Sequence, residues 1–349
     1  MADKDRREVT HKSVDGMLFA FSEVRTENRM DLLKRAEGLR AALGDRVAGP
    51  PTVLLHWSTG QKGVVAWVGF PVDRRVKRKG VETVRLEPIE VLSVVHMGPY
   101  DKVRETYLRI FDHLKDHGLL GKVTSREQVL AHNPDDPDAT LVEVQWPLHD
   151  WLGILGDCIE KHMGARVRDE VMRGVEAMTV DTSKEERRRW TLAAIRRFEA
   201  VANDEQQFEC LSRCADEFSQ YRIAELRAVY RKTRSVDAVL EEMRKDFSWY
   251  EGPRRKGRVV YVSKIPFDPE GLKAARTPKE ERRARCHCGL IRDHLGEVPS
   301  AYCWCGAGWY RQQWEGILGK PVRIRLVRSL ARGDDECVFA IELPDGVKV

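Results

Sequence analysis

Residues 1–150 contain an order of predicted elements that occurs twice, and this repeat constrains the fold more than any other feature of the sequence. Each copy is predicted as a strand, a helix and two strands. The strand segments are apolar or alternate between apolar and polar residues, and the helical segment has apolar residues three or four positions apart. The first copy comprises a strand in 17–25, a helix over Met30–Leu43, and strands in 52–58 and 63–72. The second follows at an offset of about 75 residues, so we expect two βαββ units.

The second copy repeats the pattern of the first in the same order. It begins with an apolar strand in 89–100, followed by a helix from Asp101 with Tyr107 and Phe111 on its apolar stripe, and by strands in 126–136 and 139–148. The closing segments of the two copies, VGFPV and VQWPL, match in length, in apolar character and in their Pro-apolar ending. Two such units packed side by side predict a cleft between the two helices and the sheet.

Four segments in these copies resemble the GyrI-like small-molecule-binding family, which also supplies effector domains of AraC-type and multidrug-sensing regulators. They are HMGPYDKVRETY, Gly-Pro-Pro followed by His-Trp in Gly49–Trp57, VGFPV and EVQWPL. The resemblance covers about residues 10 to 150 and implies that lipophilic, often cationic or aromatic compounds bind in the pseudo-twofold cleft. It also implies a ligand-facing glutamate on the final strand, four residues before the proline. Glu143 takes that position relative to Pro147.

The residue types agree with this expectation, because a carboxylate among aromatic rings attracts an organic cation by charge and through the ring faces. The predicted ligand-binding residues are Trp57, Trp67, Tyr100, Glu143 and Trp146. Each also has a plainer interpretation. Glu143 fits a solvent-facing charge on an alternating strand, and each tryptophan fits a core or sheet-face aromatic residue.

After residue 150 the sequence changes character. Residues 152–247 are predicted to be helical, with dense Arg, Glu and Ala, and from Val259 strands appear, including a C-terminal hairpin joined by ARGDD. The predicted fold class is therefore α+β: a duplicated βαββ domain in 1–150, a helical region in 151–250, and a cysteine-rich α+β module with a small antiparallel sheet in 251–349. We expect 151–349 to form one domain.

Two Cys-x-Cys pairs, Cys286 with Cys288 and Cys303 with Cys305, lie in the C-terminal module, and Cys337 follows them. Closely spaced thiolates favour a soft metal ion, because the metal removes their mutual repulsion. The two pairs predict a structural zinc site closed by four cysteines. The alternatives are inert thiols buried as small apolar groups, or a redox-active or disulfide-bonded pair.

The last 55 or so residues resemble the 4-vinyl-reductase-like domain, the sensor module of phenol-responsive activators and a module of tetrapyrrole-related proteins. The matching elements are Cys-Trp, Gly-x-Gly-Trp, Leu-Gly-Lys-Pro-Val and Gly-Asp-x-x-Cys-x-Phe. The resemblance implies a zinc ion held by the cysteine of Cys-Trp and by two cysteines eight residues apart. Cys303 and Cys337 match two of these positions, but the third is Ser329, a poor zinc ligand. Cys337 is therefore our substitute for a member of the favoured set.

The net charge and the lengths of the apolar segments restrict the class of protein. A net charge of +5 is mild, and the basic runs 74–79, 187–189 and 254–256 fit solvated faces, so we expect no direct nucleic-acid binding. The charged N-terminus lacks the pattern of a signal peptide, and we expect no membrane span. A cytoplasmic protein with reduced cysteines is the expectation.

Three functions follow as expectations. The leading one is binding of a small lipophilic or cationic aromatic compound, for sensing, sequestration or drug resistance. The second is hydrolysis of strained cyclopropane-type compounds, as the GyrI-like resemblance implies, with Glu143 as base and Tyr100 as hydrogen-bond donor. The third is binding of a protein partner such as DNA gyrase. In the second, aromatic walls would hold a flat substrate; a pull-down with and without small ligands would distinguish the third from the first two.

Overall fold

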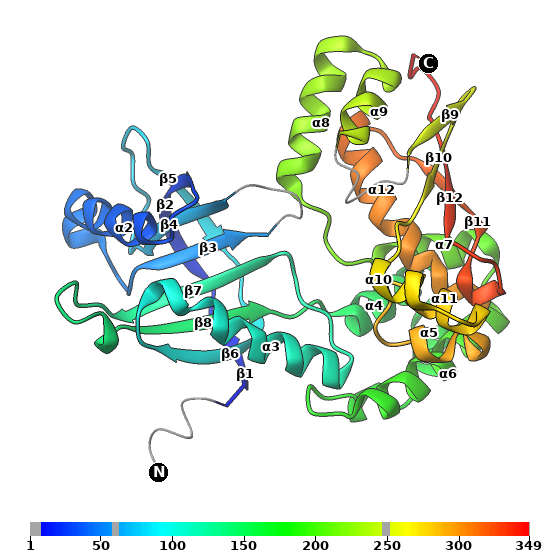
Figure 1. Ribbon diagram of the computed structural model, residues 1–349, viewed down its shortest axis with the longest axis horizontal. Helices are drawn as coiled ribbons and strands as arrows, with labels where there is room; N and C mark the ends of the chain where they lie inside the picture. Colours follow the sequence, from blue (N-terminus) through cyan, green and yellow to red (C-terminus); the bar gives the residue numbers. More distant parts are fainter. Residues whose placement is uncertain (1–7, 58–62, 246–251, 349) are drawn as a thin grey trace. The chain divides into compact units, whose positions relative to one another are not determined.

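The computed structural model describes residues 8–57, 63–245 and 252–348. The predicted end of one strand at residue 58 and the predicted end of the helical region at 247 lie outside these ranges. The chain forms two compact units, Met1–His149 and Asp150–Val349, and its elements confirm the α+β class (Figure 1). Within the described ranges, no helix has the length and apolar character needed to cross a bilayer.

The first unit consists of two copies of one pattern, each with a helix between pairs of strands. In the first copy the elements are β1 (Thr10–Val14), β2 (Met17–Thr26), α2 (Met30–Leu43), β3 (Thr52–His56) and β4 (Val64–Pro71). In the second they are β5 (Glu82–Leu86), β6 (Ile89–Met97), α3 (Arg104–His117), β7 (Thr124–Ala131) and β8 (Leu141–Pro147). The predicted duplicated βαββ pattern is confirmed, and each copy has a leading strand that the sequence had not indicated.

All these strands form one antiparallel sheet in the order β1-β6-β8-β7-β3-β4-β2-β5. The copies meet in the middle, where β3 pairs with β7. The leading strands are exchanged: β1 pairs with β6 of the second copy, and β5 pairs with β2 of the first. Interchanging the copies only reverses the strand order, so the sheet has a pseudo-twofold axis at the β3–β7 pair.

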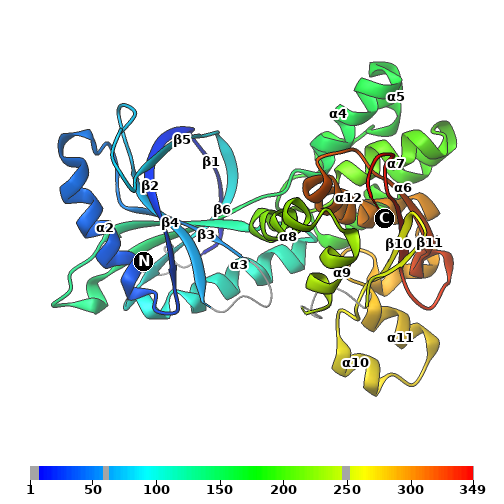
Figure 2. The same cartoon turned by 90° about the horizontal axis from the view of Figure 1, so that it is seen from above.

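Among the described residues of this unit, the helices α2 and α3 pack on one face of the curled sheet (Figure 2), α2 against β2 and β4 and α3 against β6 and β8. Because successive side chains of a strand point to opposite faces, the two faces differ in composition. The helix-facing side chains form the main core, which includes Leu32, Ala66, Val94, Ile110 and Val144. The opposite face has a smaller apolar cluster around Phe19, Phe21 and Leu54. The register of each strand thus decides which side chains meet the helices.

The second unit combines helices with a small sheet. Its helices are α4 (Trp151–Met163), α5 (Ala165–Val171), α6 (Lys184–Val201), α7 (Asp204–Arg213), α8 (Gln220–Thr233), α9 (Val236–Arg244), α10 (Pro269–Ala274), α11 (Pro278–Arg285) and α12 (Trp304–Leu318). The strands β9 (Arg254–Lys256), β10 (Val259–Ser263), β11 (Arg323–Arg328) and β12 (Val338–Glu342) form an antiparallel sheet in the order β11-β12-β10-β9. The pairing of β11 with β12 is the predicted C-terminal hairpin.

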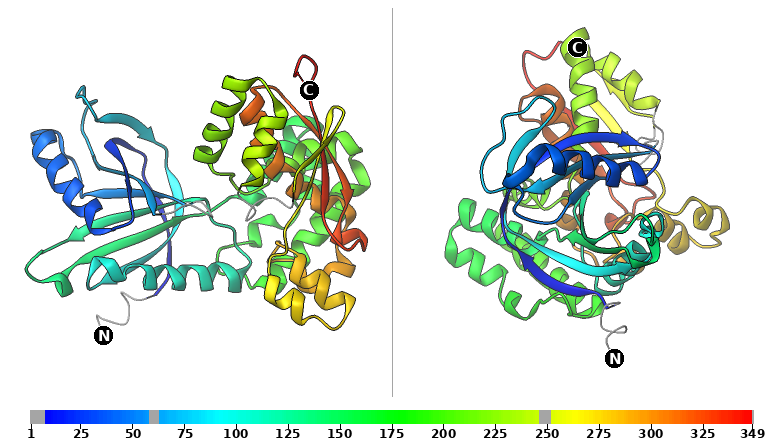
Figure 3. Two further views of the ribbon diagram at one scale, coloured as in Figure 1. Left: turned by 45° about the horizontal axis from the view of Figure 1, so that its top comes forward. Right: turned by 90° about the vertical axis from the view of Figure 1, so that its left-hand side faces the viewer.

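Helix α12 is the central packing element of the second unit and contacts α7, α8 and β11 (Figure 3). Its close approach to α7 and α8 depends on two glycines. A Cβ atom on Gly308 would lie 1.7 Å from the carbonyl oxygen of Ser212, and one on Gly316 would lie 2.5 Å from a methyl carbon of Ile223. Any larger side chain would therefore push the helices apart.

Candidate functional site

A buried carboxylate, Glu127, lies at the centre of the helix-facing side of the first unit. Strand alternation on β7 places it on the same face as Ser125 and Val129, against α3. Its side chain is 0% exposed. Tyr100 Oη donates a hydrogen bond to Oε2 at 2.5 Å, Tyr107 Oη donates one to Oε1 at 2.6 Å, and the guanidinium of Arg29 forms an ion pair with Oε1.

The groups around Glu127 keep it paired with hydrogen-bond donors. Burial and the negative charge of Glu127 raise the pKa of both Tyr100 and Tyr107 well above the usual value for a phenol, so both remain protonated donors. For Arg29, burial opposes the charged form most strongly, but Glu127 and the two tyrosines together outweigh burial and raise the guanidinium pKa. The cluster therefore holds one negative and one positive charge, bridged by neutral phenols.

An aromatic cluster continues from Tyr107 toward the surface. The ring centroid of Tyr107 lies 5.4 Å from that of Trp57 and 5.8 Å from that of Trp146, and Phe111 lies 4.8 Å from Trp146. These separations are typical of edge-to-face aromatic pairs. Ser125 connects the two clusters, because it accepts a hydrogen bond from Trp57 Nε1 at 2.7 Å and lies 3.0 Å from Tyr107 Oη.

The aromatic cluster has an exposed rim and a buried base. Trp57 and Phe111 are 38% and 37% exposed, whereas Trp146 is buried. Within the described chain, Trp146 Nε1 has no hydrogen-bond partner. Gly121 leaves the space that this ring edge occupies, since a Cβ there would lie 2.0 Å from Nε1. A flat aromatic compound can thus contact exposed rings that lead toward a buried charge.

Of the predicted ligand-binding residues, the structure brings Trp57, Tyr100 and Trp146 together in these clusters. Glu143 and Trp67 lie on the opposite face of the sheet, among the side chains that do not meet the helices. The pattern of β8 explains this for Glu143, because its two neighbours on the strand, Val142 and Val144, face the helices.

Glu143 is surrounded by hydrogen-bond donors on its own face. It accepts from Ser93 Oγ at 2.6 Å and from Gln145 Nε2 at 2.9 Å, and it forms an ion pair with Lys12. Burial opposes its charge, but these three donors outweigh burial and lower its pKa. Trp67 lies elsewhere on this face, stacked on Phe21 with ring centroids 4.2 Å apart.

Arg126 is the neighbour of Glu127 on β7 and points to the same face as Glu143. It is 5% exposed, and within the described residues its Nε and Nη1 atoms have no hydrogen-bond partner. Burial lowers its pKa. Consecutive residues of one strand therefore place a compensated acid on one face and an uncompensated base on the other.

Sequence reasoning missed Glu127, Tyr107 and Arg29 as site residues. Tyr107 was on the predicted apolar stripe of its helix. Glu127 could have been found by extending the strand alternation through Ser125 and Val129, which places an acid at a helix-facing position. No local signal marks Arg29, whose partner is 98 residues away in the sequence.

The cysteines of the predicted zinc site are free thiols in the second unit. Burial raises the pKa of Cys286, and so do its neighbours Cys288, Cys303 and Cys337. Burial, followed by the influence of Cys337, raises the pKa of Cys303 to about 12. Cys337 thus interacts electrostatically with two of the favoured four cysteines, Cys286 and Cys303.

Cys305 shares the neighbour Cys288 with Cys286 and Cys303, but its other neighbours differ. Burial raises its pKa to about 12 against a hydrogen bond with Trp151, and its charge acts on buried Cys214. Ser329, at the position where the resemblance implies a third cysteine, forms a hydrogen bond with Cys303. Within the described part of the chain, no three His, Cys, Asp or Glu side chains form a group that could hold a metal ion. The zinc site stays a prediction.

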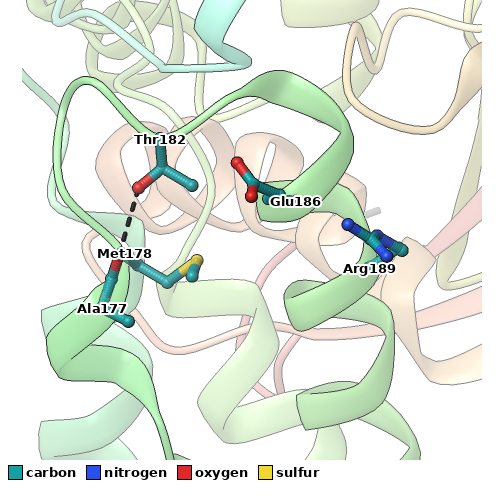
Figure 4. A pocket seen from close by; sticks show the side chains of 5 residues that line it. All are labelled: Ala177, Met178, Thr182, Glu186 and Arg189. Carbon is teal, nitrogen blue, oxygen red and sulfur yellow. Dashed lines mark hydrogen bonds between the residues drawn. The ribbon is translucent and has the colours of Figure 1, made fainter.

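A surface pocket in the second unit is lined by Ala177, Met178, Thr182, Glu186 and Arg189 (Figure 4). Thr182 Oγ1 donates a hydrogen bond to the Ala177 carbonyl oxygen at 3.2 Å. Glu186 accepts one from Ser183, the residue that caps α6. Both polar side chains therefore stabilise the turn that precedes α6, and nothing in this pocket indicates a ligand.

No family model and no curated protein matches this chain. Among solved structures, it is similar over 40% of its length to EcmrR in a complex with DNA, at 17% identity and a TM-score of 0.37, and spans 57% of that chain. The isolated EcmrR C-terminal domain gives 16% identity, 96% coverage of that chain and a TM-score of 0.36.

Two further structures match a similar share of this chain. SAV2435 bound to tetraphenylphosphonium is 11% identical over 45% of this chain and 99% of that one, with a TM-score of 0.33. A hydrolase encoded by lin2189 from Listeria innocua is 13% identical over 42% of this chain and 96% of that one, with a TM-score of 0.31. At such scores, a function for this chain has to be argued from its own side chains.

Proposed function

We propose that the first unit is a GyrI-like small-molecule-binding domain whose ligand is a lipophilic aromatic cation. The observation that carries this proposal is Glu127, a fully buried carboxylate connected through Tyr107 to partly exposed aromatic rings. Burying a carboxylate costs several kcal/mol unless charged or hydrogen-bonded partners offset the cost. Such a group at the base of an aromatic cluster attracts a ligand that supplies positive charge and ring surface.

Each part of the cluster has a role in this proposal. The exposed faces of Trp57 and Phe111 receive the aromatic part of the ligand, and Trp146 extends the stacking surface inward. Tyr100 and Tyr107 orient the carboxylate with their hydroxyl groups. A ligand held in this way is suited to sensing or sequestration.

The same geometry favours binding over hydrolysis. A general base needs a free lone pair within hydrogen-bond reach of a water molecule. Glu127 already accepts from two phenols and an arginine, and Glu143 accepts from Lys12, Ser93 and Gln145. Three donors leave each carboxylate about one of its four lone-pair positions. Glu127 has no exposed surface through which water could reach it, and the lowered pKa of Glu143 makes it a weak base.

The test is titration of the full chain with tetraphenylphosphonium, followed by tryptophan fluorescence and calorimetry. Glu127→Gln keeps the shape of the side chain and removes its charge, so we expect the affinity to fall about tenfold or more. Glu143→Gln is the matched control on the opposite face and should change Kd less than about twofold.

The opposite ranking of the two variants would contradict the proposal. If Glu143→Gln weakens binding and Glu127→Gln does not, the ligand binds on the face away from the helices. If the wild-type protein does not bind the probe and no other aromatic cation saturates it, the function is not binding of this class. Circular dichroism of both variants excludes loss of folding as the cause.

A further inference from the structure

We propose that Arg29 occupies the subsite for the ligand's cationic group, and that the preferred ligands are aromatic amidinium or guanidinium compounds that displace it. This inference rests on the proposed function and specifies its ligand class. It concerns the guanidinium group that now neutralises Glu127.

The contacts of Arg29 are those expected of a bound cationic ligand. Its guanidinium forms an ion pair with Glu127. The same group lies over the ring of Tyr100, with its carbon 5.2 Å from the ring centroid, which is within the range of a cation–π interaction. One side chain therefore supplies both the charge and the stacking that a ligand would bring.

Access to the carboxylate also points to Arg29. Glu127, Tyr100 and Tyr107 are almost completely inaccessible, whereas the Arg29 side chain is 16% exposed. Among the groups bonded to Glu127, Arg29 is thus the one that reaches solvent. A ligand can approach the carboxylate most directly by taking the place of this side chain.

The backbone on both sides of Arg29 is held, so its side chain can leave without a change of fold. Asn28 Oδ1 accepts a hydrogen bond from the Met30 amide at 3.0 Å, and Thr26 Oγ1 donates one to Asp31 Oδ2 at 2.7 Å. The Arg29 Nε atom is buried and has no hydrogen-bond partner within the described residues. A guanidinium with one unsatisfied donor is held less firmly than a fully bonded one.

These contacts also indicate which cations compete best. An amidinium or guanidinium is planar, weakly hydrated and carries several N–H donors. It can therefore form an ion pair with Glu127, donate hydrogen bonds to its carboxylate oxygens and stack on the Tyr100 ring. A phosphonium or quaternary ammonium ion supplies charge without donors. An attached aromatic ring would reach the Tyr107, Trp146 and Trp57 cluster.

The experiment compares naphthalene-2-carboxamidine with its neutral analogue, naphthalene-2-carboxamide, on the full-length protein. Arg29→Met removes the competing charge and keeps an unbranched side chain. We expect it to bind the amidine about tenfold more tightly than the wild type does, and the amide with an unchanged affinity. In the double variant Arg29→Met/Glu127→Gln, the gain should disappear.

The matched control is Arg40→Met. Arg40 is in α2, the helix that Arg29 precedes, about 16 Å along the helix axis from Arg29. Its guanidinium carbon lies 5.9 Å from the ring centroid of Phe70. The variant should bind both compounds as the wild type does. Should Arg29→Met fail to fold, Arg29→Gln removes the charge with a polar side chain and carries the same expectation.

Weaker or unchanged binding of the amidine by the Arg29 variants would overturn the proposal. An equal gain in affinity for the amide would also overturn it, because the gain would then result from the space that the arginine vacates and not from removal of its charge. Failure of the proposed function gives a different result. In that case neither the amidine nor tetraphenylphosphonium binds to the wild type or to any variant.

Discussion

Two consecutive residues of β7 illustrate how a single strand gives two charged groups opposite environments. Glu127 meets α3 and has three partners, whereas Arg126 meets the other face and has two unpartnered nitrogen atoms within the described residues. Desolvation of a guanidinium is expensive, and the burial that lowers the Arg126 pKa is not offset by any acidic neighbour among the described residues. The two positions therefore respond in opposite ways to loss of charge.

Replacing Arg126 should stabilise the protein. Arg126→Met keeps much of the side-chain volume and removes the unsatisfied donors, so we expect the free energy of unfolding to rise by about 1–3 kcal/mol. Urea denaturation measures this change. A loss of stability would show that the guanidinium has a partner, such as a bound anion, in solution.

His56 makes the stability of the first unit depend on pH. Burial lowers its pKa to about 4, against the opposing charge of Glu23, while the unfolded chain has the usual value near 6.5. Between these values the unfolded state binds the proton and the folded state does not, so stability falls as the pH drops from about 6.5 to 4. We expect His56→Gln to reduce this slope in thermal melts recorded across the range. Parallel curves for the two proteins would contradict the assignment.

At the scale of elements, local periodicity predicted most of the first unit, and non-local pairing explains what it missed. The helices and inner strands have strong apolar patterns that can be recognised within each segment. The strands β1 and β5 are short, half-exposed edge strands whose partners belong to the other copy, so no pattern in THKSV or ETVRL reveals them.

The candidate site was predictable to a similar extent. Aromatic residues in apolar segments could be listed, and Trp57, Tyr100 and Trp146 do meet. Whether an acid faces the helices depends on the register of its strand. The sequence does not fix this register to within one residue, and a shift of one residue would place Glu127 on the other face. The contact with Arg29 depends on how the two copies pack, which no local pattern contains.

The packing of α12 gives a prediction about helix contacts. A Cβ at position 308 would overlap the Ser212 carbonyl oxygen, so we expect Gly308→Ala to lower the free energy of unfolding by about 1–3 kcal/mol. Gly38→Ala on α2 is the control with the opposite sign. Its Cβ would meet no atom within 4 Å, and alanine should add about 0.5–1 kcal/mol to a helix interior. Equal effects in chemical denaturation would refute this account of the α12 contacts.

Single cysteine substitutions can test the zinc prediction. Cys337 raises the pKa of both Cys286 and Cys303, whereas Cys305 interacts with Cys288 and with Cys214, which is outside the predicted set. If zinc is bound, we expect about one ion per chain by elemental analysis, lost in Cys337→Ser and retained in Cys305→Ser. Absence of metal from wild-type protein purified under reducing conditions would leave these thiols as apolar core groups.

For the whole molecule, the two units have separate cores and separate sheets. The predicted domain boundary near residue 150 can be tested by expressing the fragment that ends at His149. We expect this fragment to unfold in one cooperative transition and to bind tetraphenylphosphonium with the affinity of the full chain. An unfolded or aggregated fragment would show that the first unit depends on the rest of the chain.

The exchange of β1 and β5 between the two copies has a consequence for the ancestry of the first unit. Neither half completes its own part of the sheet, because each leading strand pairs with the other half. A chain with a single copy could form the same strand order only by exchanging its leading strand with an identical chain, as a twofold symmetric dimer does. The duplicated domain is therefore the covalent equivalent of a swapped homodimer. Unlike the two chains of a homodimer, two linked copies can differ in sequence, and here Glu127 of one copy pairs with Arg29 of the other.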